Sequence, residues 1–323
     1  MLQAPVCPIG AMTKPVLRIA SRGSPLALTQ SRLVRSALAR AHGWTDHESE
    51  ALCPIIPIKT TGDRIQDRPL VEAGGKGLFV KEIEEALLKG DADIAVHSMK
   101  DMPAVQPPAL IIAAVLERED PHDVFVASDK GPFARLKPQA KLGTSSVRRQ
   151  AQALRARPDL EIVSLRGNVE TRLAKLTRGE ADGILLARAG LTRLGIQPDG
   201  AEPMTEWLPA LCQGAIGIEI RANDHRAAEL VAPIDDRDTH IAIACERGFL
   251  AALDGSCRTP IAGLARIAGT RLEFRGEVLT PDGRDSWSAS RGIASGSHEA
   301  AGEAGRDAAR EILERAGGKL PRF

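Results

Sequence analysis

The feature that most constrains the fold is a pattern of helix, glycine turn and short apolar strand that occurs twice. The first copy runs through Lys89-Gly90-Asp91-Ala92-Asp93 into the apolar run Ile94 to Val96. The second runs from a predicted helix over Val169 to Arg178, through Gly179-Glu180-Ala181-Asp182, into a strand over Gly183 to Ala187. Short apolar runs are typical of buried strands, and glycine commonly ends a helix. We therefore predict two similar α/β lobes, arranged as a clamshell with the ligand between them.

The remaining segments fit these lobes and a smaller α+β domain. A strand over Val16 to Ala20 precedes Ser24 and Pro25, which suit the N-cap and first position of a helix. After the acidic linker Pro233 to Asp238, we expect a helix, three strands and a closing helix from about Glu299. The expected domains are a disordered tail over 1–15, a first lobe over 16–116 and 215–232, a second lobe over 117–214, and a C-terminal domain over 237–323.

Composition argues against several classes of partner. The net charge of the 323 residues is +1, so no global field would recruit nucleic acid or membrane. Aromatic residues make up 3% and tyrosine is absent, which disfavours base-stacking platforms. The five cysteines are odd in number and form no CxxC pair, which favours a reduced cytoplasmic setting without a bound metal. No signal peptide or apolar stripe for assembly is recognised, so we expect a cytoplasmic monomer.

Polar side chains gather directly after the first repeated strand. They occupy four of five positions, His97, Ser98, Lys100 and Asp101, and Pro103 then stops regular structure. The loop after a strand's C-terminal end faces the ligand crevice in an α/β sheet. A carboxylate there, with a lysine beside it and a histidine nearby, suits acid/base or cation-stabilising work. The alternative is a solvated turn.

Cations cluster at two helix starts in the second lobe. Arg148 and Arg149 follow Thr144-Ser145-Ser146, and Arg172 follows Arg166-Gly167-Asn168. A cation at a helix N-terminus opposes the helix dipole by about 0.3–1 kcal/mol. Four arginines so placed imply that an anion belongs between them, and the arginine fork suits carboxylate or phosphate. Gly74-Gly75-Lys76-Gly77, before a helix expected from Leu78, is a weaker candidate for anion binding.

One loop of the C-terminal domain presents a thiol beside a cation. Its sequence is Asp254-Gly255-Ser256-Cys257-Arg258. A free cysteine is most often a small core residue, but a neighbouring cation favours the reactive thiolate. The loop alone leaves both interpretations open.

These segments together resemble the porphobilinogen deaminase family over the chain from about Val16 to the last helix. The resemblance is carried by LRIASRGSPLAL (Leu17 to Leu28), GGKGLFVKEIE (Gly74 to Glu84), ADIAVHSMKDMP (Ala92 to Pro103), EREDPHDVF (Glu117 to Phe125), GTSSVRRQAQ (Gly143 to Gln152), LRGNVETRL (Leu165 to Leu173), CQGAIGIE (Cys212 to Glu219) and GSCRTPIA (Gly255 to Ala262). The sequence departs from a common family pattern at Glu72, where lysine is frequent, and at Cys212 and Ser256, where glycine is frequent.

The resemblance implies three domains and a dipyrromethane cofactor joined by a thioether to Cys257. Four porphobilinogen units are then added head to tail with loss of ammonia, and water releases hydroxymethylbilane for tetrapyrrole (haem) biosynthesis. Each pyrrole carries two carboxylates, which accounts for an arginine cluster in a chain of nearly zero net charge.

The resemblance also implies roles for individual residues. Asp101 corresponds to the catalytic carboxylate. The residues implied to bind the cofactor are Cys257, Lys100, Thr144, Ser145, Ser146, Arg148, Arg149, Arg166 and Gln213. Those implied to bind substrate are Arg22, Ser24, Lys76, Arg172 and Arg193.

Two alternatives compete with this interpretation. A non-catalytic two-lobed binding protein for a small anion would share the lobes and arginines, but would need neither Asp101 nor a reactive Cys257. A cysteine hydrolase using Cys257 and His97 would need an oriented histidine and an oxyanion hole, and the sequence identifies neither.

Overall fold

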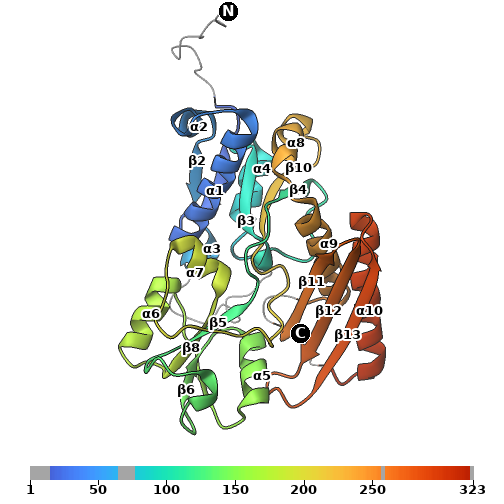
Figure 1. Cartoon of the computed structure of the whole chain (residues 1–323). Coiled ribbons are helices and arrows are strands. Elements are labelled where there is room, and N and C mark those ends of the chain that lie inside the picture. The colour runs from blue at the N-terminus through green and yellow to red at the C-terminus, as the bar shows by residue number, and fades with distance from the viewer. Residues whose placement is uncertain (1–14, 65–76, 256–258, 321–323) are drawn as a thin grey trace, which may run out of the picture.

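The computed structural model describes residues 15–64, 77–255 and 259–320. Within these residues the strands form three sheets (Figure 1). The first sheet has the order β2-β1-β3-β10-β4, built from β1 (Ile19–Arg22), β2 (Ile55–Ile58), β3 (Ile94–Ser98), β4 (Leu110–Val115) and β10 (Ile216–Arg221). The strands β1, β2 and β3 are parallel, whereas β10 runs antiparallel to both β3 and β4.

The second sheet repeats this plan. Its order is β7-β6-β8-β5-β9, built from β5 (Asp123–Ala127), β6 (Lys141–Gly143), β7 (Glu161–Val163), β8 (Gly183–Ala187) and β9 (Glu202–Pro203). Here β6, β7 and β8 are parallel, and β5 is antiparallel to β8 and β9. The chain passes from the first lobe to the second between β4 and β5, which is the first crossing. It returns between β9 and β10, which is the second crossing. The antiparallel strands β5 and β10 each follow directly after one of these crossings.

Alternating side chains bury the first sheet on both faces. On β3, Ile94 and Val96 belong to the cluster that includes Leu17, Val34 and Leu38, whereas Ala95 belongs to the cluster with Ile83 and Leu87. This is the pattern expected of a parallel strand covered by helices on both sides. The helices of the two lobes are α1 (Pro25–His42), α2 (Asp46–Leu52), α3 (Thr61–Arg64), α4 (Lys81–Lys89), α5 (Val147–Ala156), α6 (Val169–Thr177), α7 (Arg188–Leu194) and α8 (His225–Val231).

The third domain packs two helices on an antiparallel sheet. The helices are α9 (Arg237–Ala252) and α10 (His298–Ala316), and the strands are β11 (Ile261–Ala268), β12 (Arg271–Leu279) and β13 (Ser286–Ala294). It contacts both lobes. Arg118, on the first crossing, forms a buried ion pair with Glu246 on α9 at 2.6 Å, and Gln150 on α5 donates to the carbonyl of Pro281 at 3.2 Å.

These observations confirm the predicted fold class of two similar α/β lobes and a small α+β domain. Ser24 caps α1 by accepting a hydrogen bond from Ala27 N, and Pro25 is its first residue, as predicted. Several boundaries differ by a few residues. The first strand is displaced to Ile19–Arg22, and the helix expected from Leu78 begins at Lys81 because Gly77 to Val80 form a turn. The predicted tail lies almost entirely outside the described residues.

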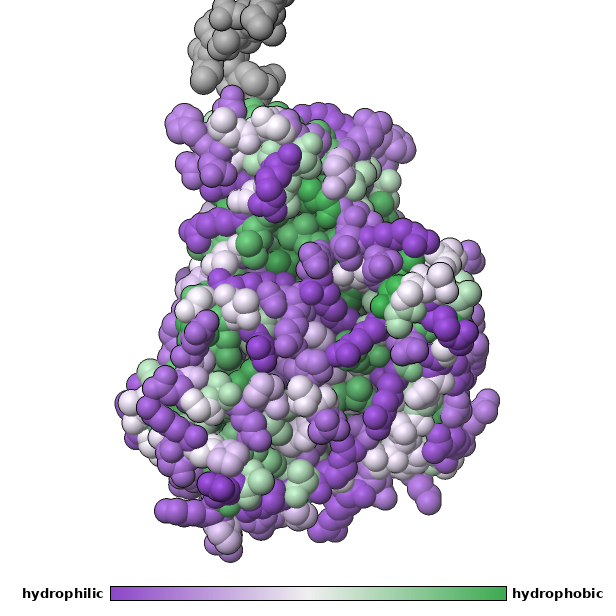
Figure 2. All heavy atoms as spheres, in the orientation of Figure 1, coloured by the Kyte–Doolittle hydropathy of each residue, from purple (hydrophilic) through white to green (hydrophobic). Residues whose placement is uncertain are grey.

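Hydrophilic side chains cover most of the face shown in Figure 2, and hydrophobic ones gather on the upper lobe. In the described part of the chain, no helix combines the length and apolarity needed to cross a membrane.

Candidate active site

The C-terminal ends of β1 and β3 place Arg22 and Asp101 at one edge of the first sheet. Both strands run parallel and adjacent, so their ends meet at that edge. Arg22 ends β1, and the 3₁₀ turn η1 (Met99–Asp101) follows β3 directly. Met99 and Met102 are buried, whereas Asp101 is exposed. The turn is thus anchored by its methionines and presents the Asp101 carboxylate to solvent.

The parallel strands of the second lobe end at a comparable edge. Thr144 to Ser146 follow β6, and the Thr144 hydroxyl accepts a hydrogen bond from Ser146 N at 3.1 Å. Ser146 caps α5, and its hydroxyl accepts from Arg149 N at 3.4 Å. Ser145 donates to the carbonyl of Leu165 at 3.0 Å, which ties this loop to the one after β7. These bonds fix the start of α5 and therefore the origin of both arginine side chains.

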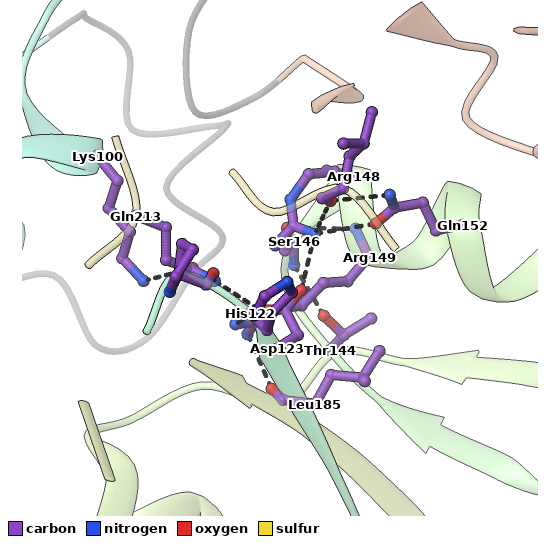
Figure 3. Close-up of polar contacts among 12 residues, drawn as sticks. Lys100, His122, Asp123, Thr144, Ser146, Arg148, Arg149, Gln152, Leu185 and Gln213 are labelled. Atoms are coloured by element: carbon purple, nitrogen blue, oxygen red, sulfur yellow. Dashed lines mark hydrogen bonds and ion pairs between the residues drawn. The ribbon is translucent and has the colours of Figure 1, made fainter. Parts of the chain in front are cut away.

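Arg148 and Arg149 converge on the buried carboxylate of Asp123, the first residue of β5 (Figure 3). Arg148 Nη1 lies 2.7 Å from Asp123 Oδ2, and Arg149 Nη2 lies 2.7 Å from Asp123 Oδ1. All three side chains are at least 93% buried. The anion inferred between the arginines is therefore, in part, the protein's own carboxylate.

Sequence reasoning did not identify Asp123. Burial opposes its charged form, but the two guanidiniums outweigh that effect and hold the pKa of the Asp123 carboxyl well below its usual range. A signal was present, because Asp123 opens the apolar strand Asp-Val-Phe-Val-Ala. A charge at the start of a fully buried strand needs a partner of opposite charge.

A chain of hydrogen bonds joins the two lobes at this point. Lys100 Nζ donates to Gln213 Oε1 at 3.2 Å, and Gln213 Nε2 donates to Asp123 Oδ1 at 2.8 Å (Figure 3). Lys100 comes from the first lobe, Gln213 from the returning crossing and Asp123 from the second lobe. Burial lowers the pKa of the Lys100 ammonium to about 8. The structure therefore brings together Lys100, Gln213, Arg148 and Arg149, with Thr144 and Ser146 beside them (Figure 3).

The arginine pair retains unused donors. Arg148 Nε and Arg149 Nε are buried and have no hydrogen-bond partner among the described residues. Arg148 Nη1 also donates to Gln152 and to the carbonyl of Leu208, and Arg149 Nη1 donates to the carbonyl of Leu185. Two guanidiniums and a lysine around one carboxylate leave an excess of positive charge. Orphaned donors in such a field fit an anionic group that the protein itself does not supply.

Three further predicted arginines, Arg22, Arg172 and Arg193, each have their own partners outside this cluster. Arg22 pairs with Asp63 and lies 4.1 Å from the centroid of the Phe79 ring. Arg172 donates from Nε to the carbonyl of Gly167 at 2.8 Å, and Arg193 donates to the carbonyl of Gly214 at 2.6 Å. Burial lowers the pKa of both Arg172 and Arg193 to about 10. The charges of Arg149, Asp101 and Arg166 also act on Arg172, so it is electrostatically coupled to both lobes.

Four further predicted site residues are Arg166, Ser24, Lys76 and Cys257. Arg166 is half-buried in the loop after β7, and the Ser24 hydroxyl is engaged in capping α1. Lys76 and Cys257 lie outside the described residues, as do Glu72 and Ser256. Cys212 is buried with φ of 62°, a left-handed conformation that glycine adopts more readily than cysteine.

The expectation that His97 lies near Asp101 in the crevice is wrong. Side chains alternate along β3, and His97 faces the same side as the buried Ala95. Its ring is 5% exposed and hydrogen-bonds to the fully buried Glu219 at 3.0 Å. His97 therefore belongs to the interior of the first lobe.

Two family models match the chain. The model for "Porphobilinogen deaminase, dipyromethane cofactor binding domain" matches residues 17–229. The model for "Porphobilinogen deaminase, C-terminal domain" matches residues 240–314.

Curated relatives match over most of their length. A porphobilinogen deaminase from Nitrobacter winogradskyi is 51% identical over 304 residues, 94% of each chain. Those from Paracoccus denitrificans and Caulobacter vibrioides are 53% and 55% identical, covering 85% and 84% of this chain and 87% and 85% of their own. A periplasmic binding protein from Brucella ovis with glutathione bound aligns over 74% of this chain and 68% of its own, at 15% identity and a TM-score of 0.41.

Proposed function

Because this chain belongs to the porphobilinogen deaminase family, we propose that it joins four porphobilinogen molecules head to tail, with loss of ammonia, and releases hydroxymethylbilane. The observation that carries the assignment of residues is the bridge from Lys100 through Gln213 to Asp123. It sets the turn bearing Asp101 opposite a buried arginine pair with unused donors. A binding protein for a small anion would need no carboxylate at the mouth of that site.

The buried arginines fit a dipyrromethane cofactor. Arg148 and Arg149 would bind its carboxylates through the orphaned Nε donors, with Lys100 and Gln213 contributing further polar contacts. Thr144, Ser145, Ser146 and Arg166 would line the same side, and Cys257 would hold the cofactor by its thioether. When bound, the cofactor supplies the pyrrole carbon from which the chain grows. Asp123 keeps the guanidiniums charged and aimed while they bind it.

Asp101 is proposed as the catalytic carboxylate. Positive charge develops on the substrate as ammonia leaves, and a fixed carboxylate beside it lowers the energy of that transition state. Asp101 is held by backbone bonds of η1, such as Met102 N to Met99 O at 3.3 Å, and its side chain remains exposed to the substrate.

The residues proposed to bind the substrate carboxylates are Arg22, Ser24, Lys76, Arg172 and Arg193. Arg172 and Arg193 support this assignment because burial makes their charge costly unless an anion approaches. We also propose the domain limits 16–116 with 215–232, 117–214, and 237–323, and a cytoplasmic monomer. Cys53, Cys212 and Cys245 are free and buried, which suits a reducing compartment.

Intact mass and turnover together test this proposal. The purified protein should exceed its sequence mass by two pyrrole units and give the dipyrrole colour with Ehrlich's aldehyde reagent. Cys257→Ser should lose the excess mass, whereas Cys53→Ser should keep it. An active wild-type protein of unmodified mass would refute the cofactor assignment.

Turnover of two variants tests Asp101. Asp101→Asn keeps the shape but removes the charge, so turnover should fall by about 10²–10³ while cofactor content is normal. Asp101→Glu keeps the charge on a longer arm and should retain more activity than Asp101→Asn, though less than wild type. If the asparagine variant equals or exceeds the glutamate variant, charge stabilisation by Asp101 is the wrong mechanism.

A further inference from the structure

A buried polar chain lies behind the catalytic turn and is not explained by binding of pyrroles. Glu219 on β10 is 0% exposed and accepts hydrogen bonds from His97 Nε2 at 3.0 Å and from Gln106 Nε2 at 2.7 Å. His97 is two residues before η1, and Gln106 is five residues after Asp101. The carboxylate of Glu219 thus fixes the chain on both sides of the turn that carries Lys100 and Asp101.

The polar chain continues into the third domain through Arg247 on α9. Arg247 Nη2 donates to the carbonyl of Ala104 and to Gln106 Oε1, each at 3.2 Å. Arg247 has no ion pair with any carboxylate among the described residues, although burial disfavours its charged form. Both hydrogen bonds described for its guanidinium are therefore made to the segment just after the catalytic turn. Burying a charge without a counter-charge is costly, so we expect these two hydrogen bonds to hold residues 104–106 in place.

Apolar contacts join the same two parts. Met99 and Met102 flank Lys100 and Asp101, and both belong to a core cluster that joins α9, α10 and the third sheet to residues of the first lobe such as Val115. Gly217 makes room for this arrangement, because a Cβ at that position would lie 2.1 Å from Met99 Sδ. The two methionines therefore anchor the catalytic turn in the core shared by the first lobe and the third domain, while Asp101 stays exposed.

We propose that Arg247 is a positioning residue for Asp101. Through its hydrogen bonds to residues 104 and 106, Arg247 links the third domain to the segment that carries Asp101. The inference rests on the role proposed above for Asp101. Arg247 occupies α9, which ends at Ala252, five residues before Cys257 in the sequence. One helix therefore holds the segment beside Asp101 and leads to the point of cofactor attachment.

The test compares three variants of the cofactor-loaded enzyme. Arg247→Met keeps the apolar stem but removes every donor, and Arg247→Lys restores the charge and a single donor. Arg306→Met is the matched control, because Arg306 lines the same groove between the first lobe and the third domain but pairs with Glu303 on the surface. Cofactor content is checked first by intact mass.

Arg247→Met should lower kcat by roughly 10–100-fold with KM little changed, because a misplacement of about 1 Å can cost about 10²-fold. Arg247→Lys should recover part of that loss and carries the test if Arg247→Met is not recovered folded. Backbone amides of residues 99–106 should exchange hydrogen about tenfold faster in Arg247→Met than in Arg306→Met, as expected for loss of one or two hydrogen bonds.

The outcomes separate this inference from the proposed function. An inactive Asp101→Asn beside an Arg247→Met that matches Arg306→Met in kcat and in exchange overturns the positioning role alone. A fully active Asp101→Asn overturns the role of Asp101 and this inference with it. Equal losses of kcat in Arg247→Met and Arg306→Met also overturn it.

Discussion

Asp123 shows how a single carboxylate can prepare a site for other carboxylates. Two adjacent buried guanidiniums repel each other, and without a counter-charge burial would favour their displacement toward water. Asp123 accepts from both through its two oxygens, leaving each Nε free. The forks are therefore oriented before any ligand arrives.

We expect Asp123→Asn to lower the free energy of unfolding by about 3–5 kcal/mol, because it leaves two buried cations without their partner. Asp159→Asn is the control, since Asp159 pairs with Arg157 on the surface and its loss should matter little. Urea unfolding of both variants measures the difference. A surface-like result for Asp123→Asn would contradict the structural argument.

The same carboxylate predicts a pH dependence of stability. The folded-state pKa of Asp123 is lowered, whereas an unfolded aspartate titrates near about 3.9. The stabilising contribution is therefore fully present above that pH and is lost only as the pH falls through the lower folded-state pKa. The difference in free energy of unfolding between wild type and Asp123→Asn, measured in urea, should stay constant from neutral pH to about pH 5. It should become smaller only in stronger acid.

Lys100 predicts the alkaline limit of activity. Its ammonium has a folded-state pKa of about 8, against about 10.4 for an unfolded lysine. Between these pH values the folded state binds fewer protons at Lys100 than the unfolded state does, so this group makes folding more favourable as the pH rises. Over the same range Lys100 loses the positive charge that attracts carboxylates. We expect kcat/KM to fall above about pH 8 in wild type and at higher pH in Lys100→Arg. Identical pH profiles would exclude Lys100 as the titrating group.

At this scale the sequence predicted Asp101 and both arginines as candidates but misplaced His97 and missed Asp123. The reason is physical. A pattern of residues shows which side chains follow a strand, but whether His97 faces the crevice depends on the phase of β3 against its neighbours. The pairing of Asp123 with residues 25 and 26 positions later is a tertiary contact that no local pattern records.

At the scale of elements, α9 and α10 pack unusually close through glycines. A Cβ on Gly305 would lie 2.0 Å from the carbonyl oxygen of Cys245, whereas a Cβ on Gly302 would meet nothing nearer than 3.4 Å. Both glycines lie inside the same helix. They therefore provide a matched pair in which only one position is sterically closed.

Gly305→Ala should force the helices apart and destabilise the third domain by about 1–3 kcal/mol. Gly302→Ala should be neutral or stabilising by about 0.5–1 kcal/mol, since alanine is the better helix former. Thermal or urea unfolding of the two variants, with cofactor content recorded, gives the comparison. Equal stability of both variants would show that the helices can separate freely.

Dense apolar strands were predicted well, and the shortest helices were not. The strand predicted over Gly183–Ala187 matches the structure residue for residue, because it is a dense apolar run that follows a polar turn. The seven-residue helices α2, α7 and α8 were not anticipated. The capping box of Thr45 and Glu48 at the start of α2 was a usable signal, but so few turns carry little periodicity.

At the scale of the whole molecule, the two crossings between the lobes run side by side. Glu119 N on the first crossing donates to the carbonyl of Gly214 on the second at 3.2 Å. Gly214 has φ of +90°, and a Cβ there would lie 2.2 Å from the carbonyl oxygen of Glu119. The two crossings are therefore in direct backbone contact at the junction of the lobes.

Gly214→Ala should therefore cost more stability than Gly90→Ala. Gly90 has φ of +76° and nothing within 4 Å of its Cβ position, so alanine there meets only the left-handed backbone cost of about 1–2 kcal/mol. The excess for Gly214→Ala measures the steric closeness of the crossings. Substrate KM should rise in Gly214→Ala alone, and a pair of variants with the same stability and KM would contradict the close approach.

The position of β10 also has a consequence for how the chain is made. The second sheet is built from one continuous stretch, Asp123 to Pro203, and all its strands have emerged before β10 is synthesised. The first sheet, by contrast, has an internal gap between β3 and β4 until residues 216–221 arrive. On the ribosome, the later lobe can thus close first while the earlier lobe waits with two unsatisfied strand edges. The N-terminal lobe, which carries Asp101, is the part of the nascent chain most exposed to mispairing and to chaperones.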